Sequence, residues 1–151
     1  MRLPVDSVNL WIGVEEQQAA EEFFQNAGPL YHIVLDCSTG FILKRRTVDA
    51  MIDKFVPVDG GNFYLDVQTH LTREQLERLV LKCELSDKKV KIEMWPEGYT
   101  NYSKATDFFD FGKYYSTTKH EGRKLTARRE GAKLELCVEC WLEGPIKWEW
   151  N

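Results

Sequence analysis

The most regular pattern in the chain is an alternation of apolar and polar residues between positions 133 and 142. One parity carries Leu134, Leu136, Val138, Cys140 and Leu142. Because successive side chains of a strand point to opposite faces, a period of two predicts a β-strand with one buried and one solvated face. Residues 125–129 precede this strand across a Glu130-Gly131 turn, and residues 146–150 follow it. The sequence therefore predicts a C-terminal β-hairpin and a last short strand.

Earlier segments alternate between strand patterns and helix patterns. We expect strands at 8–12, 30–35, 41–43, 63–67 and 90–95, and helices at 14–26, 47–55 and 72–83. Thr72 with Gln75 forms a capping box, and Thr47 is a candidate N-cap for the middle helix. The segment 96–117 mixes loop residues with aromatic residues, so the pattern predicts no single element there. Together these elements predict an α+β fold in which helices pack on a largely antiparallel twisted sheet.

Length and composition predict one globular domain. The chain has 151 residues, of which 43% are hydrophobic and 29% charged. A domain of this size buries about two thirds of its unfolded surface. No linker or repeat divides the sequence, so we expect a single domain over 1–151. No apolar stretch reaches the length of a signal-sequence core or a membrane span, and we therefore expect a cytoplasmic protein without a membrane partner.

The four cysteines form no convincing metal or disulfide pattern. Cys137 and Cys140 have the spacing of a CxxC motif, whereas Cys37 and Cys83 stand alone. Residues three apart on a strand point to opposite faces, so the two sulfurs do not converge on one ion. We expect reduced thiols and no metal site. We also expect no cofactor, because the chain lacks a phosphate-binding loop and a dinucleotide fingerprint.

Two histidines carry the strongest catalytic signal. His70 stands two residues before Thr72, and His32 occupies a similar place in an earlier predicted strand. A His-x-Thr pattern used twice resembles the signature of two-histidine phosphoesterases, in which one imidazole is the general base and the other the general acid. The first copy is incomplete, because Val34 stands where a hydroxyl residue is needed. An enzyme that cleaves a phosphodiester or a nucleotide through His32, His70 and Thr72 is therefore an alternative to the main prediction.

The segment 113–133 is the most basic part of the chain. It holds seven basic and two acidic residues, whereas residues 1–60 hold five basic and nine acidic ones. With tyrosines nearby to stack on bases, single-stranded nucleic acid is a second alternative partner. The residues that would bind it are Lys119, Arg123, Lys124, Arg128 and Arg129. The overall net charge of −4 argues against this alternative, and a basic hairpin also suits a solvated sheet edge.

Aromatic residues at outward-facing positions indicate a binding surface. Trp95 and Trp141 take the polar parity of their strands, and Trp148 shares one face of the last strand with Trp150. Such residues either form a second small core under a loop or anchor a partner. The acidic and aromatic segment 97–110 has the same character. The residues expected to contact a partner protein are Trp95, Glu97, Tyr99, Tyr102, Asp107, Phe108, Asp110, Trp141 and Trp148.

These observations favour a protein that works by binding another macromolecule. A surface of carboxylates and aromatic rings suits a cationic protein partner. Small size, acidity and the lack of a catalytic motif are typical of bacterial toxin-neutralising immunity proteins and of phage-encoded inhibitors. We therefore expect a small cytosolic protein-binding inhibitor that masks its partner, for example a basic toxin.

Overall fold

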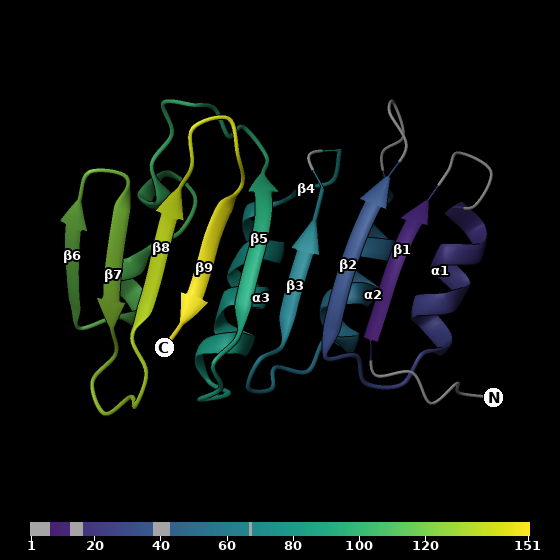
Figure 1. Cartoon of the computed structure of the whole chain (residues 1–151), viewed down its shortest axis with the longest axis horizontal. Coiled ribbons are helices and arrows are strands. Elements are labelled where there is room, and N and C mark those ends of the chain that lie inside the picture. The colour runs from purple at the N-terminus through teal and green to yellow at the C-terminus, as the bar shows by residue number, and fades with distance from the viewer. Residues whose placement is uncertain (1–6, 13–16, 38–42, 67) are drawn as a thin grey trace.

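An open β-sheet with helices against one face organises the molecule (Figure 1). The computed structural model describes residues 7–12, 17–37, 43–66 and 68–151. The strands are β1 (Ser7–Ile12), β2 (His32–Cys37), β3 (Asn62–Leu65), β4 (His70–Leu71), β5 (Lys91–Pro96), β6 (Thr117–Glu121), β7 (Lys124–Arg128), β8 (Leu136–Cys140) and β9 (Ile146–Trp150). The helices are α1 (Gln17–Asn26), α2 (Arg45–Lys54), α3 (Arg73–Glu84), α4 (Phe111–Tyr114) and the short 3-10 helix η2 (Ala105–Asp107).

The sheet joins a parallel half to an antiparallel half. Its strand order is β1-β2-β3-β5-β9-β8-β7-β6, and β4 pairs with β5 beyond the end of β3. The strands β1, β2, β3 and β5 run parallel. From β5 through β9, β8 and β7 to β6, each neighbouring pair is antiparallel. The predicted α+β fold is confirmed, and so is the C-terminal hairpin, which β7 and β8 form.

The helices of the parallel half lie on one face of the sheet. The strands β1, β2, β3 and β5 follow one another in one direction, and crossovers of one hand then place α1, α2 and α3 on the same side. Figure 1 shows α2 and α3 behind the sheet and no described helix in front of it. Residues that face the helices, such as Ile33, Phe63 and Ile92, are fully buried. The residues that alternate with them on β2, β3 and β5 stay at least partly exposed. We call their side of the sheet the open face.

The segment 97–116 covers the antiparallel half on the same side as the helices. It contains η2 and α4, and it places Phe109 and Phe111 against Trp148 with ring centroids 5.7 and 5.8 Å apart. Trp148 is 0% exposed and Trp150 is buried beside it in the same core. The tryptophans of β9 therefore form a core under this segment. Contrary to the expectation from the sequence, Trp148 is not available to a partner, because aromatic rings cover it.

The helix starts test two predicted caps. Thr72 caps α3, since its Oγ1 accepts from Gln75 N at 3.1 Å and Gln75 Oε1 accepts from Thr72 N at 3.0 Å. This capping box is confirmed. Thr47 is not a cap, because α2 begins earlier, with Lys44 as its N-cap residue, and Thr47 lies fully buried within the helix. The first turn predicted for the helix at 14–26 and most of the strand predicted at 41–43 lie outside the described residues.

Candidate functional site

Two tryptophans flank a proline at one end of the open face. The register pairs both β5 and β8 with Ile146 of β9, so the next residues, Trp95 and Trp141, lie on either side of Pro145. Trp141 N donates to the Pro145 carbonyl oxygen at 3.4 Å, which fixes this arrangement beyond the end of the ladder. The strand β4 adds His70, which pairs with Trp95. We call His70, Trp95, Pro145 and Trp141 the tryptophan row.

The tryptophan row faces solvent. Trp95 has the parity of Glu93, and Trp141 has the parity of Glu139, and both glutamates lie on the open face. Trp141 is 41% exposed and Trp95 is half-buried. The row lies where β5 ends, and the carboxyl ends of parallel strands are the usual place for binding sites in sheets of this kind.

Next to the tryptophan row, charges of opposite sign alternate from strand to strand. The register sets side by side Glu93, Lys147, Glu139, Lys124 and Glu121. Lys147 Nζ lies 3.2 Å from Glu149 Oε2 and 5.7 Å from the centre of the Trp141 ring. The hydrogen bond to Glu149 raises the pKa of Lys147 above its ordinary value. Lys147 therefore makes a cation–π contact with the Trp141 ring. We call these five residues the charge ladder, and their alternating charges keep the antiparallel half of the open face close to neutral.

The parallel half of the open face is acidic near the tryptophan row. Tyr64 lies in this region, and its pKa is raised first by burial and then by the negative charges of Asp36, Asp66 and Glu93. Asp36 and Glu93 belong to β2 and β5, on either side of Tyr64 on β3. The tryptophan row therefore borders carboxylates on one side and the balanced charge ladder on the other.

Hydrogen bonds join the loop that follows β5 to the loop between β8 and β9, next to the tryptophan row. Tyr99 donates from its hydroxyl to the Trp141 carbonyl oxygen at 3.2 Å, and Glu143 N donates to Asn101 Oδ1 at 3.0 Å. Next to these contacts, Tyr102 is 93% exposed and Leu142 is 64% exposed. The loops therefore hold large apolar groups in solvent while their backbones are fixed by hydrogen bonds.

The structure divides the predicted partner-binding residues between different places. Trp95 and Trp141 lie in the tryptophan row, and Tyr102 stands exposed on the neighbouring loop. Glu97 forms an ion pair with Arg45 at 3.0 Å. The remaining predicted contacts do not belong to the open face.

Four of those contacts lie on the helix side or point inward. Tyr99 and Phe108 pack on each other with ring centroids 5.9 Å apart. Asp107 Oδ2 accepts from Lys104 N at 2.8 Å, and Asp110 is the N-cap residue of α4. The sequence pattern treated 97–110 as one outward surface, whereas this segment packs as a cover with an inner and an outer side.

The two candidate catalytic histidines lie at opposite ends of the sheet. His32 begins β2, where its Nδ1 lies 2.9 Å from Asn62 Oδ1, and the register continues from Asn62 to Lys91. His70 pairs with Trp95, four residues further along β5. Four residues of strand span about 13 Å, so the two imidazoles do not face one phosphate. Thr72, the third member of that candidate site, is engaged as the cap of α3.

The candidate nucleic-acid residues are spread over both faces and are partly neutralised. Lys119 lies 2.9 Å from Glu121, and Arg129 Nε lies 3.3 Å from the buried carboxylate of Glu84. Lys124 belongs to the charge ladder and Arg128 is exposed. Arg123 turns to the helix side, where its guanidinium donates to the Asn101 carbonyl oxygen at 2.8 Å.

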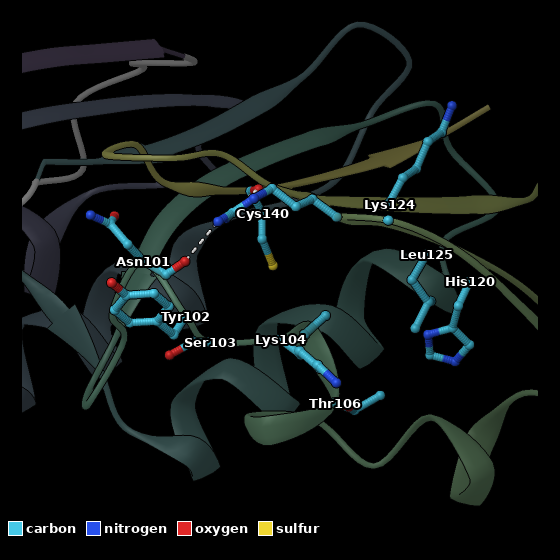
Figure 2. A pocket seen from close by; sticks show the side chains of 12 residues that line it. Asn101, Tyr102, Ser103, Lys104, Thr106, His120, Lys124, Leu125 and Cys140 are labelled. Carbon is cyan, nitrogen blue, oxygen red and sulfur yellow. Dashed lines mark hydrogen bonds between the residues drawn. The ribbon is translucent and has the colours of Figure 1, made fainter.

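Arg123 borders a hollow of about 270 Å³ between the β6–β7 turn and the loop 101–106 (Figure 2). The buried thiol of Cys140 points into it, and Tyr102 stands at one end with His120 at the other. Burial raises the pKa of Cys140, which keeps this thiol protonated at neutral pH. The hollow is separate from the tryptophan row, because it opens on the helix side of the sheet.

Several structural features bear on metal and membrane chemistry. Within residues 7–12, 17–37, 43–66 and 68–151, no group of three His, Cys, Asp or Glu side chains is placed to hold a metal ion. The same part of the chain contains no helix with the length and apolar character needed to cross a bilayer.

Cys137 and Cys140 lie on opposite sides of β8, as their spacing predicts. Burial raises the pKa of Cys137 as well as that of Cys140.

Comparison with protein-family models, with curated protein sequences and with solved structures finds no match to this chain. The function must therefore be argued from the site itself.

Sequence reasoning missed the residues that surround the two tryptophans. No local pattern marks Pro145 as part of a site, and the neighbourhood of Asp36 and Glu93 depends on strand order. The alternation of Glu93 with buried neighbours was a usable signal for its face. Lys104 and His120, which line the hollow, lack any such signal, because they come from a loop and an edge strand.

Proposed function

We propose that the protein binds another protein through the tryptophan row and thereby masks that partner's working surface. The observation that carries the proposal is the pair of partly exposed tryptophans beside Pro145 on a sheet face that no described helix covers. Tryptophan offers a large contact area for little loss of rotamer entropy, and hot spots of interfaces are rich in it. Backbone hydrogen bonds and the Lys147 contact hold Trp141 in place before binding, so little ordering cost remains.

The charges next to the row favour a basic partner. Asp36 and Glu93 lie on the open face beside it, and the chain carries a net charge of −4. Carboxylates that surround an aromatic anchor speed the encounter with a cationic surface. A basic toxin, for example a nuclease, is such a partner. The proposed function is therefore that of a cytoplasmic inhibitor of the immunity or phage-inhibitor class.

The anchors are tested by crosslinking followed by binding kinetics. A photo-crosslinking amino acid in place of Leu142, which is 64% exposed next to Trp141, captures the partner in the native cell, and the partner is then purified. Trp95→Ala and Trp141→Ala should each speed its dissociation by about 30-fold, the equivalent of about 2 kcal/mol. Leu85→Ala is the matched control. Leu85 is also an exposed apolar residue, at 68%, but it lies at the end of α3 and therefore on the other side of the sheet from the tryptophan row. Unchanged dissociation in both tryptophan variants would exclude the row as the binding surface.

The role of charge is tested by the association rate. Asp36→Asn with Glu93→Gln should slow association at low salt and flatten its salt dependence. Asp107→Asn with Asp110→Asn is the control pair, because these residues belong to the segment that covers the helix side. If only the control pair slows association, the partner binds the segment 97–110 instead. If nucleic acid co-purifies and is lost on Arg128→Glu, the nucleic-acid alternative replaces the protein-binding proposal.

A further inference from the structure

The hollow of Figure 2 is a second candidate site, independent of the proposed protein-binding function. It has a volume of about 270 Å³, just below the usual range for pockets that hold small molecules. Its floor includes the apolar side chains of Ala105 and Leu125 and the thiol of Cys140. Thr106 also lines the hollow, whereas the hydroxyl of Ser103 accepts from Thr100 N at 2.9 Å. An apolar floor with a few polar groups at the rim is the usual composition of a small-ligand site.

The charge of the hollow is positive. Its lining contains Lys104, His120, Arg123 and Lys124, and it contains no carboxylate. Figure 2 shows the Lys124 ammonium pointing away, whereas Lys104 extends along the hollow towards His120. Neither Lys104 nor Arg123 forms an ion pair within the part of the chain that the structure describes. An anion in the hollow would therefore meet the positive charges of Lys104 and Arg123 with no carboxylate in the lining itself.

Arg123 shapes the hollow as well as charging it. Its guanidinium donates to the carbonyl oxygens of Asn101 at 2.8 Å and Cys140 at 3.4 Å. These bonds join the β6–β7 turn to the loop that carries Tyr102, Ser103 and Lys104. Asp107 Oδ2 accepts from Lys104 N at 2.8 Å and fixes the other end of that loop. The walls are thus held in place by hydrogen bonds, which favours a site that exists before its ligand arrives.

Tyr102 supplies a flat apolar surface at the end of the hollow opposite His120 (Figure 2). Its side chain is 93% exposed, although tyrosine usually buries part of its ring. An exposed ring beside a cationic hollow is the arrangement on which nucleobases stack, while lysine and hydroxyl groups bind the phosphate.

We propose that this hollow binds a phosphorylated nucleoside, with the phosphate held by Lys104 and Thr106 and the base stacked on Tyr102. The same chemistry is offered by a free nucleoside monophosphate and by the phosphorylated end of a single strand. The volume of about 270 Å³ lies just below the usual range of small-molecule pockets, which favours a single nucleotide over a larger dinucleotide cofactor.

The test is a calorimetric titration of the whole chain with adenosine 5′-monophosphate, adenosine, inorganic phosphate and a 5′-phosphorylated eight-nucleotide single strand. We expect saturable binding of the monophosphate, at least about tenfold tighter than binding of adenosine or phosphate alone. Lys104→Ala should weaken it by at least about tenfold through loss of a charged hydrogen bond, and Tyr102→Ala by at least about fivefold through loss of stacking. Lys113→Ala is the control, because Lys113 is an exposed lysine of α4 that does not line the hollow.

The same titrations identify the source of the phosphorylated nucleoside and can overturn the proposal. A single strand that binds more tightly than the monophosphate, and loses affinity on Arg128→Ala, identifies nucleic acid as the source of the phosphorylated nucleoside. Equal affinity of the two probes identifies the free nucleotide. If neither probe shows saturable binding, or if Lys104→Ala and Tyr102→Ala bind as tightly as the parent chain, the proposal is overturned.

Discussion

The two halves of the sheet bury their inner faces in different ways. The parallel half is covered by α1, α2 and α3, which have ten to twelve residues each. The antiparallel half is covered by η2, α4 and the chain around them, whose helical pieces have only three and four residues. Regular helices bury a sheet with many medium-sized side chains, whereas the short segment depends on a few large rings.

The two candidate surfaces lie in the antiparallel half and at its border. Three helices fill the space behind the parallel strands. The shorter cover leaves the hollow beside β6, whose residues are all exposed. The tryptophan row lies where β5 of the parallel half meets β9 of the antiparallel half. The comparison teaches that the thinner cover provides room for ligands but makes the fold depend on individual aromatic residues.

Trp148→Ala should have the largest effect on that dependence. Trp148 is fully buried against Phe109 and Phe111, so its removal should lower the free energy of unfolding by about 3–5 kcal/mol. Hydrogen exchange should accelerate in β7, β8 and β9 more than in β2 and β3. Trp141→Ala is the control and should cost less than about 1 kcal/mol in urea unfolding. A loss this small for Trp148→Ala would contradict the aromatic core.

Glu84→Gln tests the link between the halves. Glu84 ends α3, and its buried carboxylate accepts from Trp150 Nε1 at 3.0 Å and Arg129 Nε at 3.3 Å. Loss of the charge should destabilise the fold by about 1.5–3 kcal/mol, the range for hydrogen bonds to charged groups. Glu74→Gln, at an exposed position of the same helix, should cost no more than about 0.5 kcal/mol in the same urea titration. Equal effects of the two substitutions would show that the halves are not coupled through Glu84.

Thr72→Ala should have a smaller effect, which acts through the start of α3. Its Oγ1 caps α3, and loss of a cap of this kind costs about 1 kcal/mol. Thr72→Ser should restore most of the stability, because the serine hydroxyl can accept the same hydrogen bond. Thermal unfolding monitored by circular dichroism compares the stability of the parent chain with that of the two variants. A Thr72→Ser chain as unstable as Thr72→Ala would mean that the methyl group, and not the hydroxyl, stabilises the helix start.

Glu149→Gln should have the smallest effect, and the effect should depend on pH. Hydrogen bonds from Asn151 and Lys147 lower the pKa of Glu149 below its ordinary value of 4.5. A carboxylate with a lowered pKa stabilises the fold above pH 4.5, and this contribution disappears as the pH falls through the lowered value. Because the pair is partly exposed, the difference at neutral pH should be only about 0.5 kcal/mol. Urea unfolding at pH 7 and pH 3 checks this, and a difference at pH 3 as large as that at pH 7 would contradict it.

Local pattern predicted the elements of both halves but not their arrangement. The alternation in β8 and β9 and the capping box of α3 all appear in the structure. The parallel pairing of β1, β2, β3 and β5 was not foreseen, because partners more than twenty residues apart leave no local signal. The segment 97–116 had no periodic pattern, since its short helices follow the shape of the sheet that they cover.

The sequence by itself determined which residues of a strand share a face, because a period of two assigns each side chain to a face without reference to distant residues. It also determined that Cys137 and Cys140 lie apart. Only the tertiary structure decided which face receives a cover. The segment 97–116 packs over Trp148 and buries it, while Trp95 and Trp141 stay exposed on the other side. Parity along a strand is a local property, whereas the choice between core and solvent depends on what the rest of the chain places against each face.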